Sequence, residues 1–175
     1  MKRVVVLGFF VLFSCSGCFT LAKRGLTEAQ GASGKIIPVK ECSASFYASL
    51  GGVKVRDMTN GIAPLCSPGM FMRIKTAVVG KASEVSQQLT GSDHAVLDVD
   101  VTFYKEPGGV LAVAGKSGLL IGRAIVTDDA GQQRGDLLIA VASEAVRTSE
   151  TEMAETFGET LIGHIVKRTQ NQGED

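Results

Sequence analysis

Residues 95–104 read AVLDVDVTFY, and apolar and polar side chains alternate through this stretch. A period of two is the pattern of a β-strand that buries one face and leaves the other in water. We therefore predict a strand here, in a sheet with one solvated face. The predicted buried residues are Leu97, Val99, Val101 and Phe103, and the predicted solvated residues are Asp98, Asp100, Thr102 and Tyr104.

Two more strands are predicted after this one, over residues 118–127 and 137–143. The turn between them is Asp128-Asp129-Ala130-Gly131, which combines residue types that favour tight turns. Three consecutive strands joined by short connections predict an antiparallel meander.

Two amphipathic helices are predicted on either side of the meander. The first starts at Ser67-Pro68, an N-cap followed by proline in the first turn, and its apolar face runs to near Gly91. The second follows the capping box Ser149-Glu150-Thr151-Glu152 and extends to about Arg168.

The chain before the first helix gives weaker signals. Residues 36–40 contain Pro38, which is tolerated in an edge strand, and residues 53–56 alternate as a half-buried strand does. Residues 43–50 suit a strand or a helical turn equally. We predict an α+β fold, an antiparallel sheet of about four strands with two helices packed on one face. The domain spans residues 36–168, and residues 169–175 form a polar tail.

The N-terminus has the order of a secretory signal: Lys2 and Arg3, then the apolar run 4–13, then small residues and cysteines to Cys18. The apolar run is shorter than the roughly 20 residues that cross a bilayer. At its end, Leu12-Phe13-Ser14-Cys15 resembles the lipobox of bacterial lipoproteins.

This resemblance implies that residues 1–14 are removed and that Cys15 carries acyl chains such as palmitate, with Cys18 as the alternative. More than one chain is needed for stable anchoring. Residues 15–35, rich in small and polar types, then form a tether. Ser16 is not the aspartate that retains such lipoproteins at the inner membrane, so the outer membrane is favoured. The order of elements over residues 36–168 also resembles small bacterial lipoproteins, which implies a periplasmic location and no enzyme activity.

The charges are balanced, with 18 basic and 18 acidic residues in 175. Loss of Lys2 and Arg3 with the signal leaves a slight acidic excess. Nucleic-acid binding is not expected, because it requires a basic face or stripe.

Cys42 and Cys66 lie far from the signal, and export would place them in an oxidising compartment. We predict that they form a disulfide, which would stabilise the fold by roughly 3 kcal/mol in the chain-entropy model. The alternative is two small buried thiols. Anchoring through Cys15 leaves Cys18 unpaired, whereas anchoring through Cys18 leaves no odd thiol in the mature chain.

No catalytic residue, metal site or cofactor is predicted. Gly115-Lys116-Ser117 lacks the glycine spacing of a phosphate-binding loop. Asp98 and Asp100 would lie about 7 Å apart on one strand face, which is usually simply solvated. His94 and His164, the two histidines, have no recognisable nucleophile or metal partner in the sequence.

An apolar connection, residues 108–115, joins the first two strands of the meander. Connections are normally polar, so this one packs on the core or forms an interface through Val110, Leu111 and Val113. We expect a membrane-anchored envelope protein with a binding or assembly role and a protein partner or homo-oligomer. The alternative is an exported soluble domain that binds a small ligand or metal through Asp98, Asp100 and His94, or acts as an enzyme there.

Overall fold

The computed structural model describes residues 31–63, 65–106, 118–143 and 148–171. They form a five-stranded sheet and three helices. The elements are β1 (Ala32–Lys40), α2 (Ala44–Ala48), β2 (Leu50–Asn60), α3 (Pro68–Ser86), β3 (Asp93–Lys105), β4 (Gly118–Thr127), β5 (Gln133–Ser143) and α4 (Glu150–Gln170).

The strand order in the sheet is β1-β5-β4-β3-β2. The predicted meander is confirmed: β3, β4 and β5 pair antiparallel, and β1 adds antiparallel to β5. However, β2 pairs parallel with β3, so the sheet is mixed and not wholly antiparallel. The reason is α3, because a helix that crosses between two strands returns the chain in the same direction.

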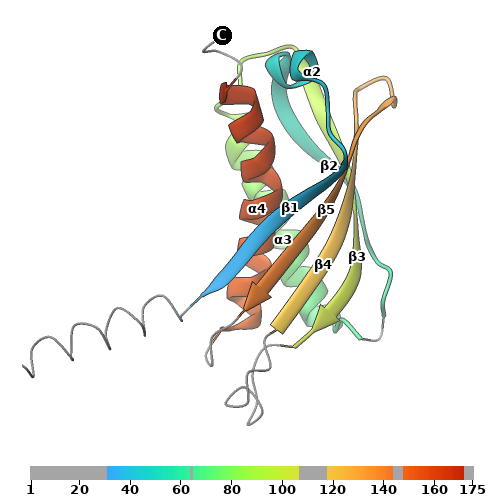
Figure 1. The fold of residues 1–175 in the computed structure, drawn as a ribbon, viewed down its shortest axis with the longest axis vertical. Coiled ribbons are helices and arrows are strands. Elements are labelled where there is room, and N and C mark those ends of the chain that lie inside the picture. The colour runs from blue at the N-terminus through green and yellow to red at the C-terminus, as the bar shows by residue number, and fades with distance from the viewer. Residues whose placement is uncertain (1–30, 64, 107–117, 144–147, 172–175) are drawn as a thin grey trace, which may run out of the picture.

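The two long helices lie on one face of the sheet, as predicted, and both start at the same end of it (Figure 1). The predicted caps are confirmed: the hydroxyl of Ser67 accepts the N–H of Met70, and that of Ser149 accepts the N–H of Glu152, each at 3.1 Å. Gly158 brings the helices together, because a Cβ there would lie 3.0 Å from the backbone of Ala77.

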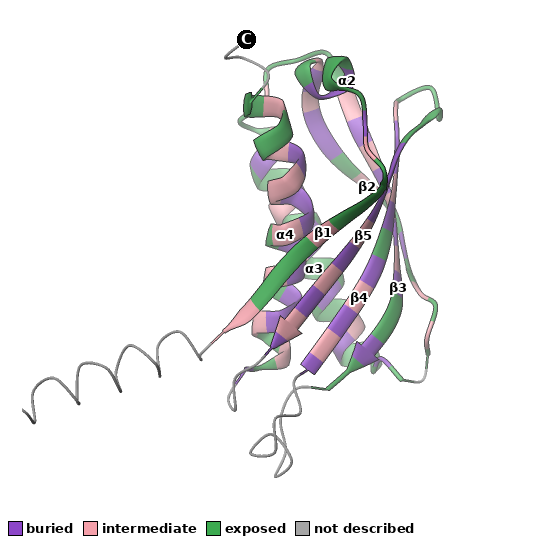
Figure 2. Cartoon of the chain, in the orientation of Figure 1, coloured by how far each residue is buried: buried purple, intermediate pink, exposed green. Residues whose placement is uncertain are grey.

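The core fills the space between the sheet and these helices. Alternate residues of β4 and β5 are buried, and the residues between them are half-buried or exposed (Figure 2). Fully buried side chains from each layer meet there, including Leu97, Leu120, Ile139, Ile74 and Phe157.

One prediction for β3 is wrong at its end. Leu97, Val99 and Val101 are buried as predicted, but Phe103 is 42% exposed and Tyr104 is buried. The register against β4 shifts between Val101 and Phe103. An extra residue at such a bulge reverses the alternation beyond it, so Tyr104 turns inward and Phe103 outward.

The boundaries differ from the prediction at several places. β1 begins at Ala32, so it includes the last four residues assigned to the tether, and α4 continues to Gln170. α3 ends at Ser86, before the predicted end near Gly91. The ambiguous residues 43–50 are mainly the short helix α2, whose N-cap is Ser43.

Candidate interaction surface on the open sheet face

The face of the sheet opposite α3 and α4 carries no helix among the described residues (Figure 1). We call it the open sheet face. Over β1, β5, β4 and the two ends of β3, its side chains are mainly apolar and half-buried or exposed. They are Ile37, Val96, Phe103, Leu119, Ile121, Ile125, Leu138 and Ala140.

The β2 side of the open sheet face is charged, and its charges are paired within the chain. Arg56 donates to Asp98 through two nitrogens, with Nε to Oδ1 at 2.9 Å. Asp100 accepts from the hydroxyl of Thr59 at 2.6 Å and from the N–H of Gly61 at 3.1 Å. Both carboxylates are therefore held by neighbours across the parallel pair of strands.

A third carboxylate, Asp136, is only 4% exposed although it lies on this face. Arg123 covers it and donates from Nε to Oδ1 at 2.8 Å. This hydrogen bond and the charge of Arg123 hold the pKa of Asp136 below its ordinary value, against the effect of burial. Arg123 also borders a hollow of about 200 Å³ with Asp98 and Asp100.

His94 is engaged elsewhere. Its Nδ1 lies 2.8 Å from Oδ2 of Asp129, in the turn between β4 and β5, and Lys54 lies 3.6 Å from the same carboxylate. The hydrogen bond to His94 and the nearby cations lower the pKa of Asp129. Because Asp98 is four residues further along β3, it lies about 13 Å from His94.

The structure thus brings together Asp98 and Asp100 but not His94. The hollow that they line is also bordered by Arg123. Of the two carboxylates, Asp98 is already paired with Arg56. Among the described residues, no group of three or more His, Cys, Asp and Glu side chains is placed to hold a metal ion.

The predicted disulfide is absent. Cys42 and Cys66 are both free and buried. Cys42 lies against Gly135 at the start of β5, whereas Cys66 lies near Tyr104 and Glu150, where β3 ends and α4 begins. The register of the sheet places these positions at opposite ends. The alternative of two buried thiols describes this structure, and burial raises the pKa of both.

A cluster around Glu41 was not predicted. Oε1 of Glu41 accepts from the hydroxyl of Tyr47 at 2.5 Å and lies 3.2 Å from Nε2 of His164, and Oε2 accepts from Arg168 at 3.2 Å. It connects the residue after β1 to α2 and to the last turns of α4. Spacing could not reveal it, because Glu41 and His164 are brought together only by the fold.

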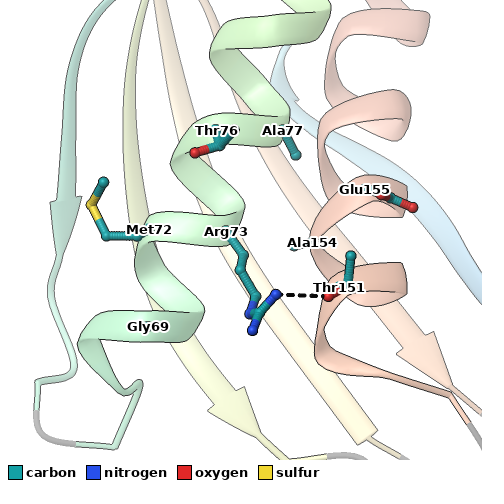
Figure 3. A pocket seen from close by; sticks show the side chains of 8 residues that line it. All are labelled: Gly69, Met72, Arg73, Thr76, Ala77, Thr151, Ala154 and Glu155. Carbon is teal, nitrogen blue, oxygen red and sulfur yellow. Dashed lines mark hydrogen bonds between the residues drawn. The ribbon is translucent and has the colours of Figure 1, made fainter.

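The outer surface of the helix layer has a separate groove of about 380 Å³ between α3 and α4. Figure 3 shows Arg73 of α3 reaching across it to Thr151 of α4, with a hydrogen bond of 2.9 Å. Met72 and Ala154 give the groove apolar walls. Arg73 and Thr151 already hydrogen-bond to each other across the groove. We therefore assign the groove a role in packing α3 against α4.

Several predicted sites lie outside the described residues. These are the lipidation residues Cys15 and Cys18 and the predicted interface residues Val110, Leu111 and Val113. No helix among the described residues is both long and apolar enough to span a membrane.

Comparisons with known proteins show similarity in fold only. No protein family matches the sequence, and no curated protein matches it. Among solved structures, the fold is similar to two PelC dodecamers from Paraburkholderia phytofirmans. One, a variant in which a leucine is replaced by methionine, is 11% identical, with a TM-score of 0.45, and the match covers 74% of this chain and 95% of that one. The other is 12% identical, with a TM-score of 0.45, and the match covers 78% and 97%. Likeness at this level carries no argument about function.

Proposed function

We propose that this chain is a lipid-anchored protein of the bacterial cell envelope, whose domain faces the periplasm and has a non-catalytic binding or assembly role. The anchor is Cys15, with Cys18 as the alternative. Residues 12–15 support this assignment through their likeness to a lipobox. Ser16 favours the outer membrane over the inner one.

The open sheet face is the observation that carries the binding role. Its apolar side chains lie beside charges that are already paired within the chain. A surface of this kind has little to contribute to acid–base chemistry, whereas contiguous apolar area is typical of protein contacts. Between Cys15 and the start of β1 there are 16 residues, enough to separate the domain from a membrane.

The anchor is tested by the intact mass of the full chain expressed in a bacterial host and extracted from membranes. We expect a diacyl or triacyl increment, and we expect a Cys15→Ala change to remove both the increment and membrane retention. Cys18→Ala is the matched control and should keep both. If Cys18→Ala alone removes the mass increment and membrane retention, the anchor is Cys18 and not Cys15. An unmodified soluble product would refute the lipid anchor.

The apolar connection is tested separately. If the connection forms an interface, Leu111→Asp or Val113→Asp should abolish the association made through it and leave the thermal midpoint of the domain unchanged, because an interface residue is not needed for the core. A lowered midpoint would show that the connection packs on the core instead.

The alternative function is an exported soluble domain that binds a small ligand or metal, or an enzyme-like domain. One observation favours it: Asp98 and Asp100 border the same hollow. Titration of the chain with Ca²⁺ or Mg²⁺, followed by calorimetry, tests this alternative. Binding that is lost in Asp100→Asn would support it. Under our proposal no saturable heat is expected, because Asp98 is already paired with Arg56 and Asp100 already accepts hydrogen bonds from Thr59 and Gly61.

A further inference from the structure

The free edge of β1 has backbone groups without partners. Pro38 pairs with Leu137 and has no N–H to donate, so it occupies a position that does not bond to β5. Because such positions alternate along an antiparallel strand, the N–H and C=O of Ala32, Gly34 and Ile36 also point away from β5. Among the described residues, no hydrogen bond to these outward groups is found.

A groove of about 480 Å³ follows this edge, between β1 and α4. Gly34 and Ile36 line it on the strand side, and Glu159, Gly163 and Lys167 line it on the helix side. Gly163 has open space around it, since a Cβ there would meet nothing within 4 Å. The groove therefore offers unpaired backbone on one wall and a helix that another helix can approach closely on the other.

The charges of α4 are separated along its length. The acidic residues Glu150, Glu152, Glu155 and Glu159 lie in its first half, and Lys167 and Arg168 lie near its end. Glu159, Gly163 and Lys167 are spaced by four residues, so they share one stripe of the helix. Such a helix is complementary to an antiparallel copy of itself, with Gly163 at the centre.

We propose that a second copy of this chain docks on this edge by twofold symmetry, with the two β1 strands antiparallel about Gly34. Pro38 limits the pairing to residues 32–36, and Gly34 is the middle of that range. Each Lys35 then lies opposite Ser33 of the second copy, so like charges do not face each other. Pairing adds about six backbone hydrogen bonds, and Glu159 meets Lys167 of the second copy.

The geometry also suits two chains that start at the same membrane. Centred on Gly34, the two Ala32 residues lie about 13 Å apart, so both N-terminal segments leave near the twofold axis. The dimer does not depend on the lipid anchor, and its test can fail or succeed independently of that anchor.

Charge reversal tests the proposal on the full chain in detergent, by sedimentation equilibrium. We expect Lys167→Glu and Glu159→Lys each to weaken dimerisation by about tenfold or more, because each creates two like-charge contacts. The double variant should return to within about threefold of the wild type. A monomeric wild-type chain, or a double variant as weak as the single ones, would overturn the proposal.

Two controls separate the interface from folding. Lys75→Glu makes the same charge change on the exposed side of α3 and should leave dimerisation unchanged. Glu159 also lies near Lys81 of α3, so Lys167→Glu is the cleaner single change, and thermal unfolding of each variant should be compared.

Cross-linking tests the register without relying on charge. All cross-linking variants also carry Cys18→Ser, because that thiol is left unpaired when Cys15 is the anchor. In the variant with Ser33→Cys and Lys35→Cys, the two new thiols of one copy face those of the other across a close antiparallel pair. We expect a covalent dimer on mild oxidation. Val39 is exposed on the same strand but lies outside the proposed pairing. The Val39→Cys variant should therefore remain monomeric in non-reducing electrophoresis. Equal cross-linking through Val39→Cys would contradict the proposed register.

Discussion

The two edge strands of the sheet differ in whether their outward backbone groups have hydrogen-bond partners in the described part of the chain. At the β2 edge, the hydroxyl of Ser86, the last residue of α3, accepts the N–H of Val53 at 2.8 Å and lies 3.0 Å from its carbonyl oxygen. At a bulge in the same strand, the carboxylate of Asp57 accepts the N–H of Met58. At the β1 edge no comparable contact is found among the described residues.

The difference shows two ways to manage an unpaired strand. β2 is closed by its own crossover helix, which ends where the strand needs partners. β1 is restricted in sequence instead, since Pro38 removes a donor and Lys35 and Lys40 carry charge. A closed edge serves the stability of one chain, whereas a restricted edge still permits pairing in one register.

The largest effect is expected from Gly51→Ala at the start of β2, where the segment that leads into β3 approaches closely. An added Cβ would lie 1.9 Å from the carbonyl oxygen of Gly91, a backbone atom that cannot turn aside. We expect the free energy of unfolding to fall by about 3 kcal/mol, measured by urea denaturation. Gly80→Ala is the matched control, because its Cβ would meet nothing and alanine favours a helix by about 1 kcal/mol. A small loss of stability in Gly51→Ala would show that the backbone around Gly91 moves easily to accommodate the added Cβ.

The next effect is that of opening the β2 edge with Ser86→Ala. Loss of the hydroxyl leaves the Val53 N–H without its partner and should cost about 1–2 kcal/mol. Hydrogen exchange of the Val53 amide should accelerate. Ser83→Ala, on an exposed position of the same helix, should leave that exchange rate unchanged. Unaltered exchange in Ser86→Ala would mean that the edge is closed by something other than this contact.

The third prediction concerns how β1 is attached. Partial burial would raise the pKa of Glu41, but its hydrogen bonds with Tyr47 and His164 and the charge of Arg168 outweigh burial and lower it. The carboxylate therefore stabilises the fold above its ordinary pKa of 4.5, and this contribution is lost as the pH falls through the lower folded-state pKa.

Glu41→Gln should thus cost about 1 kcal/mol at pH 7, and the difference from the wild type should shrink in acid. Denaturation curves at pH 7 and pH 3 measure it. A constant difference at both pH values would show that packing, and not charge, holds the end of β1.

The smallest effect is expected from Arg56→Ala. Its pair with Asp98 lies on the open sheet face and the Arg56 side chain is 53% exposed, so the loss of stability should be the smallest of the four and should diminish in salt. Thermal unfolding at low and high ionic strength measures it. A loss that exceeds that of Ser86→Ala would place the main support of β2 in its ion pair and not in its helix.

Much of the fold follows from local patterns. The alternation of residues 95–101 and the caps Ser67 and Ser149 predicted β3, α3 and α4 correctly, because each depends on near neighbours in sequence. The parallel pairing of β2 and the bulge before Phe103 were missed, since both depend on how distant segments meet.

The site was less predictable than the fold. Asp98 and Asp100 were placed correctly on one solvated face, but their partners, Arg56 for Asp98 and Thr59 and Gly61 for Asp100, come from β2 and the residue after it. Cys42 and Cys66 were paired because export would place them in an oxidising compartment and because both lie far from the signal, and neither argument contains information about direction within the sheet. The Glu41 cluster joins residues from β1 and α4, and no spacing rule connects them.

The pairing of β1 with β5 has a consequence for folding. Ala32 pairs with Ser143, so the first of the five strands cannot form its ladder until the last one is available. Until then both sides of β1 are unpaired and open to association with other chains. Pairing over this separation also slows closure of the sheet. Proline and lysine in β1 therefore protect the unfolded chain until β5 pairs with it.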